Sequence, residues 1–510
     1  MQRDGANISL WQSGINDYTP SNTGSAEAVY DVLIAGGGIT GVTTGLLLQK
    51  AGKKVVLAEA HTLCFGTTGG TTAHINSFFD TSYDQIENDF GKDAAKQIAE
   101  ATKQARELFK TNVAQYKIDC GFEEKDGYVY AQTEQQVQEL DKMFEASRAV
   151  GANIEYVQQI PLPVDFQKAI VYHEQAQLHP TRYVFALAKV FEEAGGVVLQ
   201  NCPVNKVEKE DDLLLIETGI GTLKARALIW ATHIPPGINL LHFRNAPYRS
   251  YAVALKLADD NYPDALVYDM YDPYYYYRTQ QIDGEKYLIA GGEDHKTAHE
   301  ENTAACFDHL LAHVRHYFTI KEVSRRWSSQ YFEPADGLAY IGHLPGNPDN
   351  VYVATGYGGN GITYSHIAAI TLTGLLTKGN SEFKDLFSPS RIKPIAGFAA
   401  FVQENADVVK EFVAKRIAVE KIQGLAELAH NEAKVVKYEG EKIALYKDEA
   451  GGVHAINPVC THAKCIVAWN NTEKSWDCPC HGARYNMDGE VLTGPAQNGL
   501  EKIELGTSKS

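Results

Sequence analysis

The sequence lacks any long hydrophobic run: nowhere does it approach the roughly 18 to 20 consecutive apolar residues of a membrane-spanning helix. Residues 1–20 are polar and lack the apolar stretch of a secretory signal, so we expect a cytoplasmic location. Basic residues are also scarce, with 47 Lys and Arg against 64 Asp and Glu and a formal net charge of −17. This charge disfavours nucleic acid and anionic membranes as partners.

Cysteine is too rare for a disulfide scaffold, since the 510 residues contain only eight. Four are scattered singly: Cys64, Cys120, Cys202 and Cys306. The other four crowd together near the C-terminus: Cys460, Cys465, Cys478 and Cys480. This clustering predicts a metal site in a small domain of its own. The chain length predicts two or three domains, and 44% hydrophobic and 22% charged residues indicate a globular protein.

The first regular unit is β-α-β. Residues 30–35 form a short apolar run that ends in glycine, as in a buried parallel strand. Residues 39–51 carry apolar side chains at helical spacing up to Gly52, and residues 54–58 predict a second strand. The unit is of the kind that binds nucleotides.

Between the first strand and the helix, residues 36–41 fit the pattern G-x-G-x-x-G. Gly36 allows the tight turn, Gly38 lets the backbone approach a pyrophosphate, and Gly41 lets helix and strand pack closely. The helix N-terminus adds amide donors and positive partial charge. Glu59 ends the second strand, where a carboxylate accepts hydrogen bonds from a ribose. We interpret the unit as a nucleotide site; the alternative is an ordinary strand–helix turn.

A second G-x-G-x-x-G occupies residues 356–361, after a predicted strand at 350–355. It could mark a separate NAD site. The helix that follows, at 362–376, leads to no second strand that ends in an acid. We therefore interpret this turn as a helix N-terminus that points at the same cofactor as the first.

The chain between and after these turns changes character. Residues 84–149 are charged, with apolar residues every three or four positions, which predicts helices on an insertion. Another amphipathic helix is predicted at 181–194. Residues 251–257 and 274–278 are aromatic and β-branched, which predicts an antiparallel sheet inserted into an α/β domain.

Residues 28–392 resemble the D-amino-acid-oxidase-like FAD oxidoreductases, which include glycine and sarcosine oxidases. The resemblance rests on the segments 36–59, 66–73, 179–183, 231–232 and 356–361. It implies FAD and the oxidation of a C–N bond by hydride transfer to the flavin. Cys64 and His74 do not align with the residues that tether FAD covalently in some members, so we expect noncovalent binding. The resemblance implies FAD contacts at Gly36, Gly38, Ile39, Thr40, Gly41, Glu59, Ala60, Thr67, Thr68, Thr72, Val204, Gly356, Gly358, Gly361 and Ile362.

The C-terminal cysteines form two arms with histidines. Cys460 and His462 give C-x-H, and Cys478 and His481 give C-x-x-H. Two thiolates and two imidazoles suit a Rieske [2Fe–2S] centre, and they also suit tetrahedral zinc. The length of the spacer between the arms favours the Rieske centre, and so does the unused cysteine that remains on each loop.

From residue 421 onward the chain resembles the Rieske proteins of respiratory complexes, whose loops are C-T-H-x-x-C and C-P-C-H-G. The resemblance implies cluster ligands at Cys460, His462, Cys478 and His481, and a disulfide between Cys465 and Cys480. One departure is that Ala483 replaces a serine whose hydroxyl bonds a cluster sulfur, while Tyr485 keeps the second donor. Losing one such bond is expected to lower the reduction potential.

The predicted fold is therefore an α/β Rossmann-type FAD-binding domain with an inserted antiparallel-sheet substrate domain, plus an all-β Rieske domain. The oxidoreductase domain spans 28–395, with a linker helix at 396–420 and the Rieske domain at 421–510. The FAD-binding parts are about 28–80, 175–235 and 335–395, and the substrate part is mainly 80–175 and 240–335.

Two redox centres in one chain predict a relay, in which an amine or amino acid reduces FAD and single electrons pass through the cluster to an external acceptor. Two alternatives remain open. The protein could be an electron-transfer adaptor without an organic substrate, or an O₂-using amine oxidase with a structural cluster.

Catalytic residues are harder to predict. Tyr274 and Tyr276 share one face of a predicted strand and could line a substrate pocket, with Arg278 clamping a substrate carboxylate. The alternative interpretation is that this strand belongs to a half-buried aromatic sheet and that Arg278 is solvated. His295 could be an acid–base group, or a turn residue whose hydrogen bonds are satisfied. Trp327 is expected in the core.

Overall fold

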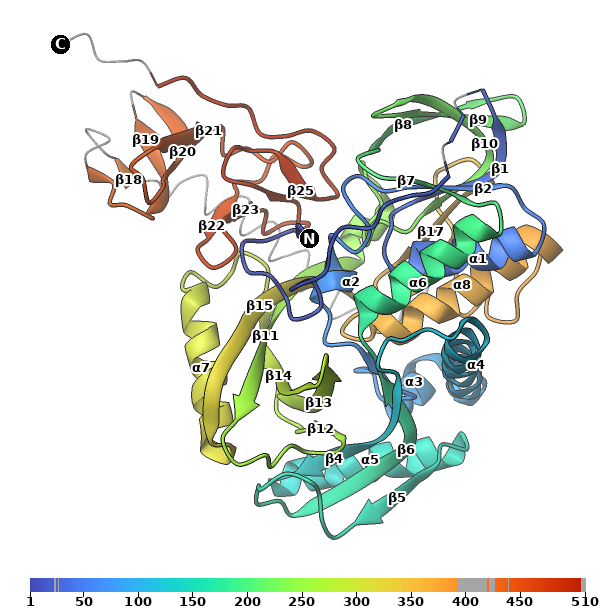
Figure 1. Ribbon diagram of the computed structural model, residues 1–510, viewed down its shortest axis with the longest axis vertical. Helices are drawn as coiled ribbons and strands as arrows, with labels where there is room; N and C mark the ends of the chain where they lie inside the picture. Colours follow the sequence, from blue (N-terminus) through green and yellow to red (C-terminus); the bar gives the residue numbers. More distant parts are fainter. Residues whose placement is uncertain (23, 26, 392–419, 422–426, 439, 506–510) are drawn as a thin grey trace.

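The computed structural model describes residues 1–505 except positions 23, 26, 392–419, 422–426 and 439. Figure 1 shows three parts: a parallel sheet with its helices, a large antiparallel sheet, and a small β domain formed by the C-terminal residues. The predicted linker helix at 396–420 lies outside the described residues, apart from Glu420, which begins β18 (Glu420–Lys421).

The first sheet has eight strands, and its centre is parallel. β1 pairs in parallel with both β2 and β10, and β10 pairs in parallel with β17. The order is β16-β17-β10-β1-β2-β7, with the β8–β9 hairpin joined to β10 through β9. The strands are β1 (Val29–Ala35), β2 (Val55–Ala58), β7 (Val197–Leu199), β8 (Val204–Glu210), β9 (Leu213–Thr218), β10 (Gly221–Trp230), β16 (Tyr340–His343) and β17 (Val351–Thr355).

Three helices cover one face of this sheet: α1 (Ile39–Lys50), α6 (Pro180–Glu193) and α8 (Gly361–Lys378) (Figure 1). β2 is buried throughout, and β1 is buried from Val32 to Ala35, which explains the apolar sequence of these stretches. In this order, β2 lies on one side of β1, and β10 and β17 lie on the other, so the strand order reverses at β1. Ligands of such sheets bind at the carboxyl ends of the strands where the order reverses.

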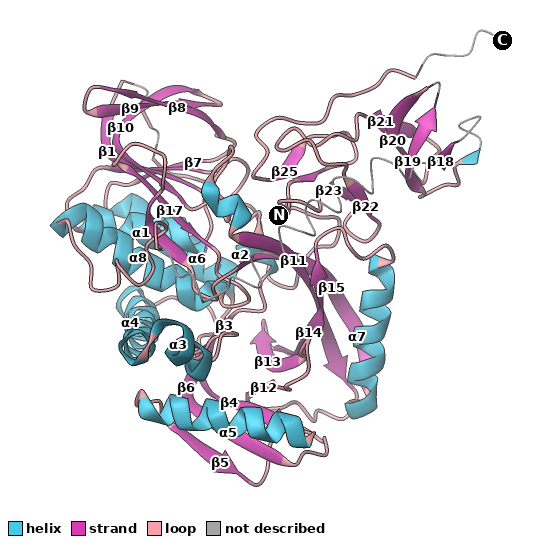
Figure 2. Ribbon diagram, turned by 180° about the vertical axis from the view of Figure 1, so that it is seen from behind, coloured by secondary structure: helices cyan, strands magenta, loops and turns pink. Residues whose placement is uncertain are grey.

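The second sheet has nine strands, and all its neighbours pair antiparallel except β12 and β4. Helices α5 (Glu134–Ala149) and α7 (Thr303–Tyr317) pack against it (Figure 2). Its strands are β3 (His74–Ile75), β4 (Glu123–Ala131), β5 (Ile154–Val157), β6 (Lys168–Gln177), β11 (Asn245–Leu257), β12 (Leu266–Tyr268), β13 (Tyr276–Ile282), β14 (Glu285–Lys296) and β15 (Ile320–Pro334).

One element in the insertion differs from the expectation of helices alone. Helices α3 (Tyr83–Phe90), α4 (Lys92–Tyr116) and α5 (Glu134–Ala149) do form, but β4 lies between α4 and α5. Its apolar run is short and embedded in charged sequence. Its partners, β6 and β12, are distant in the chain, so only long-range pairing identifies it as a strand.

The C-terminal domain is built from two four-stranded sheets, as the predicted all-β class requires. The first contains β18, β19 (Ala433–Tyr438), β20 (Glu441–Lys447) and β21 (Val453–Ile456); the second contains β22 (Ala468–Asn470), β23 (Ser475–Asp477), β24 (Arg484–Tyr485) and β25 (Val491–Thr493). Two loops approach each other beside the second sheet, one after β21 and one between β23 and β24.

The N-terminal arm, residues 1–15, lies between the large parts of the molecule (Figure 1). Trp11 is fully buried, and its indole N–H donates to the carbonyl of Thr71 next to α2 (Thr67–Gly70). Ala6 N–H donates to the carbonyl of Glu473 in the C-terminal domain, at 3.1 Å. Among the described residues, no helix has the length and apolar character needed to cross a bilayer.

Candidate functional site

The turn after β1 requires glycine for steric reasons. Gly36 has φ +111°, and a Cβ there would lie 2.4 Å from the carbonyl oxygen of Ala231, which directly follows the neighbouring β10. A Cβ on Gly41 would lie 2.0 Å from the carbonyl oxygen of Gly36. Gly36 and Gly41 therefore bring β1, β10 and α1 together more closely than any side chain would allow.

The predicted ribose-binding carboxylate is held at the same turn. Glu59 Oε2 accepts a hydrogen bond from Gly37 N–H at 2.6 Å, and its Oε1 accepts one from His61 N–H at 2.9 Å. Burial raises the pKa of Glu59, although these backbone donors oppose the shift. The carboxylate is thus fixed beside the glycine turn, where the sequence pattern predicts it.

A single cavity of about 1400 Å³ joins the two glycine-rich turns. Gly41 and Gly356 do not line it; Gly356, with φ +71°, shapes the second turn instead. The cavity is lined by the other residues predicted to contact FAD: Gly36, Gly38, Ile39, Thr40, Glu59, Ala60, Thr67, Thr68, Thr72, Val204, Gly358, Gly361 and Ile362. Since both turns open into one space, the arrangement is that expected for one shared cofactor.

The donors around this cavity fit a dinucleotide. Helices α1 and α8 both begin at it, and neither N-terminus has a side-chain cap or an acidic residue in its first turn. Ile39 N–H of α1 donates to the Thr68 hydroxyl at 3.1 Å, and the positive partial charge of two helix N-termini suits an anionic ligand. Cys64 and His74 also line the cavity. Burial raises the pKa of the Cys64 thiol well above its usual value.

The two C-terminal loops bring the side chains of the predicted cluster ligands together in like pairs. Cys460 and Cys478 are hydrogen-bonded to each other, which lowers the pKa of Cys460 to about 6. The rings of His462 and His481 lie 4.9 Å apart. Among the described residues, these four side chains do not gather around one point as the ligands of a single ion would. Sulfur beside sulfur and imidazole beside imidazole is the distribution of a Rieske cluster, with two cysteines on one iron and two histidines on the other.

The histidine nitrogens are left open for metal. Nδ1 of His462 and Nδ1 of His481 are buried without a hydrogen-bond partner. His462 Nε2 donates to the carbonyl of Gly237 at 3.1 Å, which fixes the tautomer that leaves Nδ1 unprotonated. Burial lowers the pKa of His481 to about 3, so the ring is neutral at pH 7, as a metal ligand must be. The residues therefore fit a [2Fe–2S] cluster.

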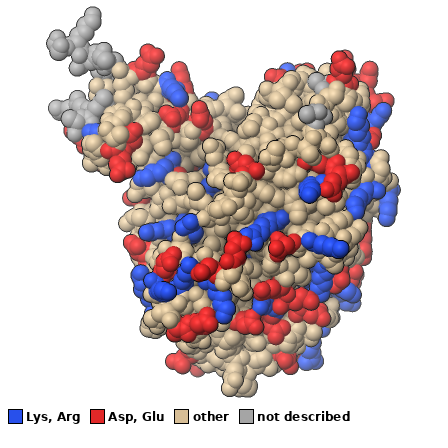
Figure 3. All heavy atoms as spheres, in the orientation of Figure 1, with Lys and Arg blue, Asp and Glu red and all other residues tan. Residues whose placement is uncertain are grey.

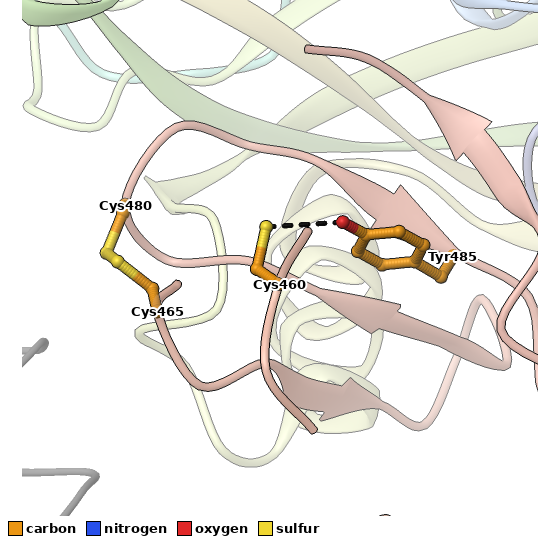
Figure 4. Close-up of a disulfide and its surroundings, with 4 residues drawn as sticks. All are labelled: Cys460, Cys465, Cys480 and Tyr485. Carbon is orange, nitrogen blue, oxygen red and sulfur yellow. Dashed lines mark hydrogen bonds between the residues drawn. A yellow bond between two sulfur atoms is a disulfide. The ribbon is translucent and has the colours of Figure 1, made fainter. Parts of the chain in front are cut away.

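Cys465 and Cys480 form a disulfide that joins the two loops (Figure 4). On the other side of Cys460, the Tyr485 hydroxyl lies 3.2 Å from the Cys460 sulfur (Figure 4). The same hydroxyl accepts a hydrogen bond from Thr461 N–H at 3.3 Å. The disulfide and Tyr485 hold the first loop on both sides of its predicted cysteine ligand, Cys460.

Comparison with known proteins agrees with both sites. A family model described as FAD dependent oxidoreductase matches residues 31–375. The chain belongs to this family. A second model, described as Rieske [2Fe-2S] domain, matches residues 419–504. FAD and a [2Fe–2S] cluster are accordingly its cofactors, and we call the matched parts the FAD domain and the Rieske domain.

Three proteins illustrate the similarity. A Bacillus subtilis (strain 168) protein named "Putative Rieske 2Fe-2S iron-sulfur protein YhfW" is 32% identical over 477 residues, which cover 93% of each chain. The "Gamma-glutamylputrescine oxidoreductase" of Escherichia coli (strain K12) is 22% identical, over 76% of this chain and 93% of its own. The crystal structure of glycine oxidase from Geobacillus kaustophilus shares the fold, with a TM-score of 0.61 and 20% identity over 71% of this chain and 99% of its own.

The predicted catalytic candidates have separate places. Tyr274 and Tyr276 both line the FAD-domain cavity, as strand alternation predicts. Tyr274 donates a hydrogen bond to Asp80 Oδ1 at 3.2 Å. Tyr277 of β13 and Tyr275, which precedes this strand, face the opposite way, and Tyr275 stacks on His313 of α7 at 3.7 Å between ring centroids.

Arg278 does not clamp a substrate carboxylate, contrary to the expectation. It is fully buried, and its NH1 donates to the carbonyls of Thr72 and Ala73, both at 2.7 Å. Its guanidinium lies 5.2 Å from the ring of Trp11. Because backbone carbonyls occupy these donors, Arg278 fastens the segment after α2 and does not line the cavity.

His295 also lies outside the cavity. Its Nδ1 faces the carbonyl of Lys296 at 2.8 Å, and its Nε2 faces the Tyr251 hydroxyl at 2.9 Å. A carbonyl only accepts, so Nδ1 carries the proton and Nε2 accepts from Tyr251. Both nitrogens are used, as in the alternative interpretation, although the residue lies in β14 and not in a turn. Trp327 is buried in the core, as expected, and donates to the carbonyl of Gly70 at 2.7 Å.

Sequence reasoning missed Asp294, which precedes His295 and lines the cavity. Its Oδ2 accepts a hydrogen bond from the Tyr331 hydroxyl at 3.0 Å. The available signal was strand alternation, since neighbours in a strand face opposite sides. Without the pairing of β14 with β11 and β13, the sequence could not show which side faces the cofactor.

The Rieske domain is seated on the FAD domain at the cluster loops. Besides the contact of His462 with Gly237, Gln330 Nε2 donates to the carbonyl of Gly482 at 2.8 Å. His242, from the short helix η1 (Leu240–Phe243), lies 4.7 Å from the His462 ring. Figure 3 shows the surface hollowed between the two domains, and residues of the Rieske domain after β24 line the same cavity as the FAD-binding turns.

A buried charge network fixes this arrangement. It contains three arginines and three carboxylates, so its charges balance. The N-terminal arm supplies Arg3 and Asp4, β11 supplies Arg249, and the Rieske domain supplies Glu473, Asp477 and Arg484. Arg484 lies 3.0 Å from Asp4 and 3.2 Å from Asp477. The arm thus joins the two domains through side chains that are almost fully excluded from solvent.

Proposed function

We propose that this protein oxidises the C–N bond of an amine or amino acid and passes the electrons one at a time through its Rieske cluster to an external acceptor. The observation that carries the proposal is the short connection between the predicted cluster ligand His462 and the FAD cavity. The loop that contains Gly237, the partner of His462, begins with residues 231–234, which line the cavity. One loop of seven residues, 231–237, therefore connects the two cofactor sites.

Bound FAD would supply two-electron hydride chemistry, and a [2Fe–2S] cluster would supply transfer of one electron at a time. The substrate carbon loses the hydride and the nitrogen loses a proton, which leaves an imine that water hydrolyses. The chain holds the substrate against the cofactor between β11, β13, β14 and β15. On the side of the cluster, Gln330 and the loop 231–237 fix the distance between the two sites.

A chain that returned its electrons directly to dioxygen would need no cluster in this position. The balanced charge network argues for the same conclusion, because it holds the Rieske domain in one orientation with its histidine ligands toward the FAD domain. A domain that only extended the fold would not need its metal ligands at the interface.

The test is anaerobic stopped-flow spectroscopy of the holoprotein with a panel of amines and amino acids. We expect bleaching of the flavin band by a substrate, followed by reduction of the cluster at a matching rate. A cluster that stays oxidised while the flavin is fully reduced would refute the relay. If only a reduced protein, and no small molecule, bleaches the flavin, the adaptor alternative is correct.

A cluster-free control separates the remaining alternative. Cys478→Ser removes a cluster ligand without touching the FAD turns. We expect this variant to be bleached by substrate as the wild type is, but to reduce no one-electron acceptor. Undiminished turnover with hydrogen peroxide release in air would instead favour an O₂-using oxidase with a structural cluster.

A further inference from the structure

One end of the cavity has a composition that restricts the substrate. Six side chains form it, and we call them the tyrosine–aspartate box: Asp80, Tyr248, Tyr274, Tyr276, Asp294 and Tyr331. The tyrosines come from β11, β13 with its preceding turn, and β15, while Asp294 comes from β14. Asp80 lies in the loop before α3. None of these elements carries the predicted FAD contacts.

The walls of the box are aromatic rings. Tyr248 and Tyr331 stack with 5.8 Å between their centroids, and Tyr274 and Tyr276 are also 5.8 Å apart. Gly291 is paired with Tyr276 across the strands, and a Cβ there would lie 2.2 Å from the Tyr276 ring. The glycine therefore lets this ring lie flat across the sheet. Faces of tyrosine rings attract cations.

Asp294 offers the box an open carboxylate oxygen. Its Oδ2 is bound by Tyr331, but its Oδ1 is buried and makes no hydrogen bond to any described residue. The Ser250 hydroxyl lies close enough to Asp294 to oppose the rise in its pKa, but its geometry leaves Oδ1 without a hydrogen bond. A buried carboxylate oxygen without a donor is costly unless a ligand supplies one. The oxygen is thus placed to receive an N–H group from a bound molecule.

Cations are almost absent from the cavity wall. Among the described residues that line it, Lys502 of the Rieske domain is the single lysine and there is no arginine. Lys502 Nζ is 3.9 Å from Asp488, at the Rieske-domain side and not at the box. Arg278, the expected carboxylate clamp, is engaged by backbone carbonyls. A substrate carboxylate in the box would therefore meet two aspartates and no compensating charge.

We propose that the tyrosine–aspartate box binds an ammonium group of the substrate, with Asp294 as its ion-pair partner, and that the substrate is an amine without a carboxylate next to the reacting carbon. The inference rests on the proposed function and chooses between its two substrate classes. The tyrosine faces surround the cation, and Asp294 Oδ1 accepts its N–H or neutralises its charge. An α-amino acid brings a carboxylate that this end of the cavity repels.

The test measures binding and not turnover. Isothermal titration calorimetry of the FAD-loaded protein compares tetramethylammonium, which has no N–H and is not oxidised, with pivalate, an anion of similar size. We expect the cation to bind at least about tenfold more tightly than the anion. Equal or tighter binding of pivalate would overturn the proposal, whatever any variant does.

A matched pair of variants assigns the effect to Asp294. Asp294→Asn keeps the shape of the side chain and removes its charge, and we expect it to weaken tetramethylammonium binding about tenfold. Asp212→Asn makes the same change at an exposed position between β8 and β9 and should have no effect. Unchanged cation binding in Asp294→Asn, with FAD content equal to the wild type, would contradict the role of Asp294.

The anaerobic panel then separates this inference from the proposed function. Bleaching by amines alone supports both, and bleaching by amino acids alone leaves the proposed function standing but overturns the box. If cations bind in a way that depends on Asp294 but no amine bleaches the flavin, the role of the tyrosine–aspartate box stands and the proposed amine oxidation is refuted.

Discussion

At the scale of single residues, the most informative side chain is Asp294, because its ionisation is set by the surroundings that define the box. Burial, helped by the nearby Asp80 and Asp272 and opposed by Ser250 and Tyr331, raises its pKa to about 7. The carboxyl is neutral at pH 6 and mostly charged at pH 8. A cation prefers the charged form.

Cation affinity should therefore depend on pH. Between pH 6 and pH 8, the association constant of tetramethylammonium should rise about tenfold, because the ionised fraction of Asp294 rises by that factor around a pKa near 7. Calorimetry at both pH values measures it. In Asp294→Asn the dependence should disappear, and a slope that persists in this variant would assign it to another group.

A second residue-scale prediction concerns the reduction potential of the cluster. Ala483 is fully buried, and its carbonyl accepts a hydrogen bond from the N–H of the predicted ligand Cys478 at 2.8 Å. Ala483→Ser places a hydroxyl beside this loop, and one added bond to sulfur should raise the potential by about 40 mV, the equivalent of about 1 kcal/mol for one electron. Tyr485→Phe removes the hydroxyl that lies 3.2 Å from the Cys460 sulfur and should lower the potential by a similar amount. Redox titration followed by electron paramagnetic resonance measures both; shifts of the same sign in the two variants would contradict the argument.

At the scale of elements, the sequence predicts those segments whose structure depends on residues close together in the chain. The β1–α1–β2 unit and the turn before α8 follow from apolar runs and from glycines that no other residue could replace, since a Cβ at Gly36 or Gly41 would clash with backbone oxygens. The cluster loops are equally local. Their ligands and the disulfide partners lie within two short motifs, and the structure pairs Cys465 with Cys480 as the resemblance implied.

Long-range pairing limits the prediction elsewhere. β4 became visible as a strand only through its partners β6 and β12, and the face that each residue of β13 and β14 presents depends on a register that one chain segment does not contain. Arg278 shares a strand face with Tyr276, but the arm and the segment after α2 cover it, so its donors meet carbonyls and not substrate. For the same reason, the sequence could not show that Asp294, and not its neighbour His295, lines the cavity.

At the scale of the whole molecule, the relay depends on how firmly the Rieske domain sits on the FAD domain. The buried network balances Arg3, Arg249 and Arg484 with three carboxylates, and Glu473 is the one that reaches β15. Its Oε1 accepts hydrogen bonds from Ser328 N–H at 2.9 Å and from the Ser328 hydroxyl at 2.7 Å. Removing the charge of Glu473 would leave one arginine without a counter-charge in a site closed to water.

Glu473→Gln should therefore weaken domain docking. The uncompensated buried charge should cost about 3 kcal/mol or more of unfolding free energy, and the domains should separate before either unfolds. Small-angle scattering should show a larger radius of gyration with unchanged secondary structure by circular dichroism. Because the FAD turns are untouched, substrate should bleach the flavin at the wild-type rate while cluster reduction slows.

Glu501→Gln, the same change at an exposed position of the Rieske domain, should alter neither the radius of gyration nor the rate of cluster reduction. Wild-type transfer to the cluster in a variant whose domains have separated would mean that docking does not set the rate of the relay.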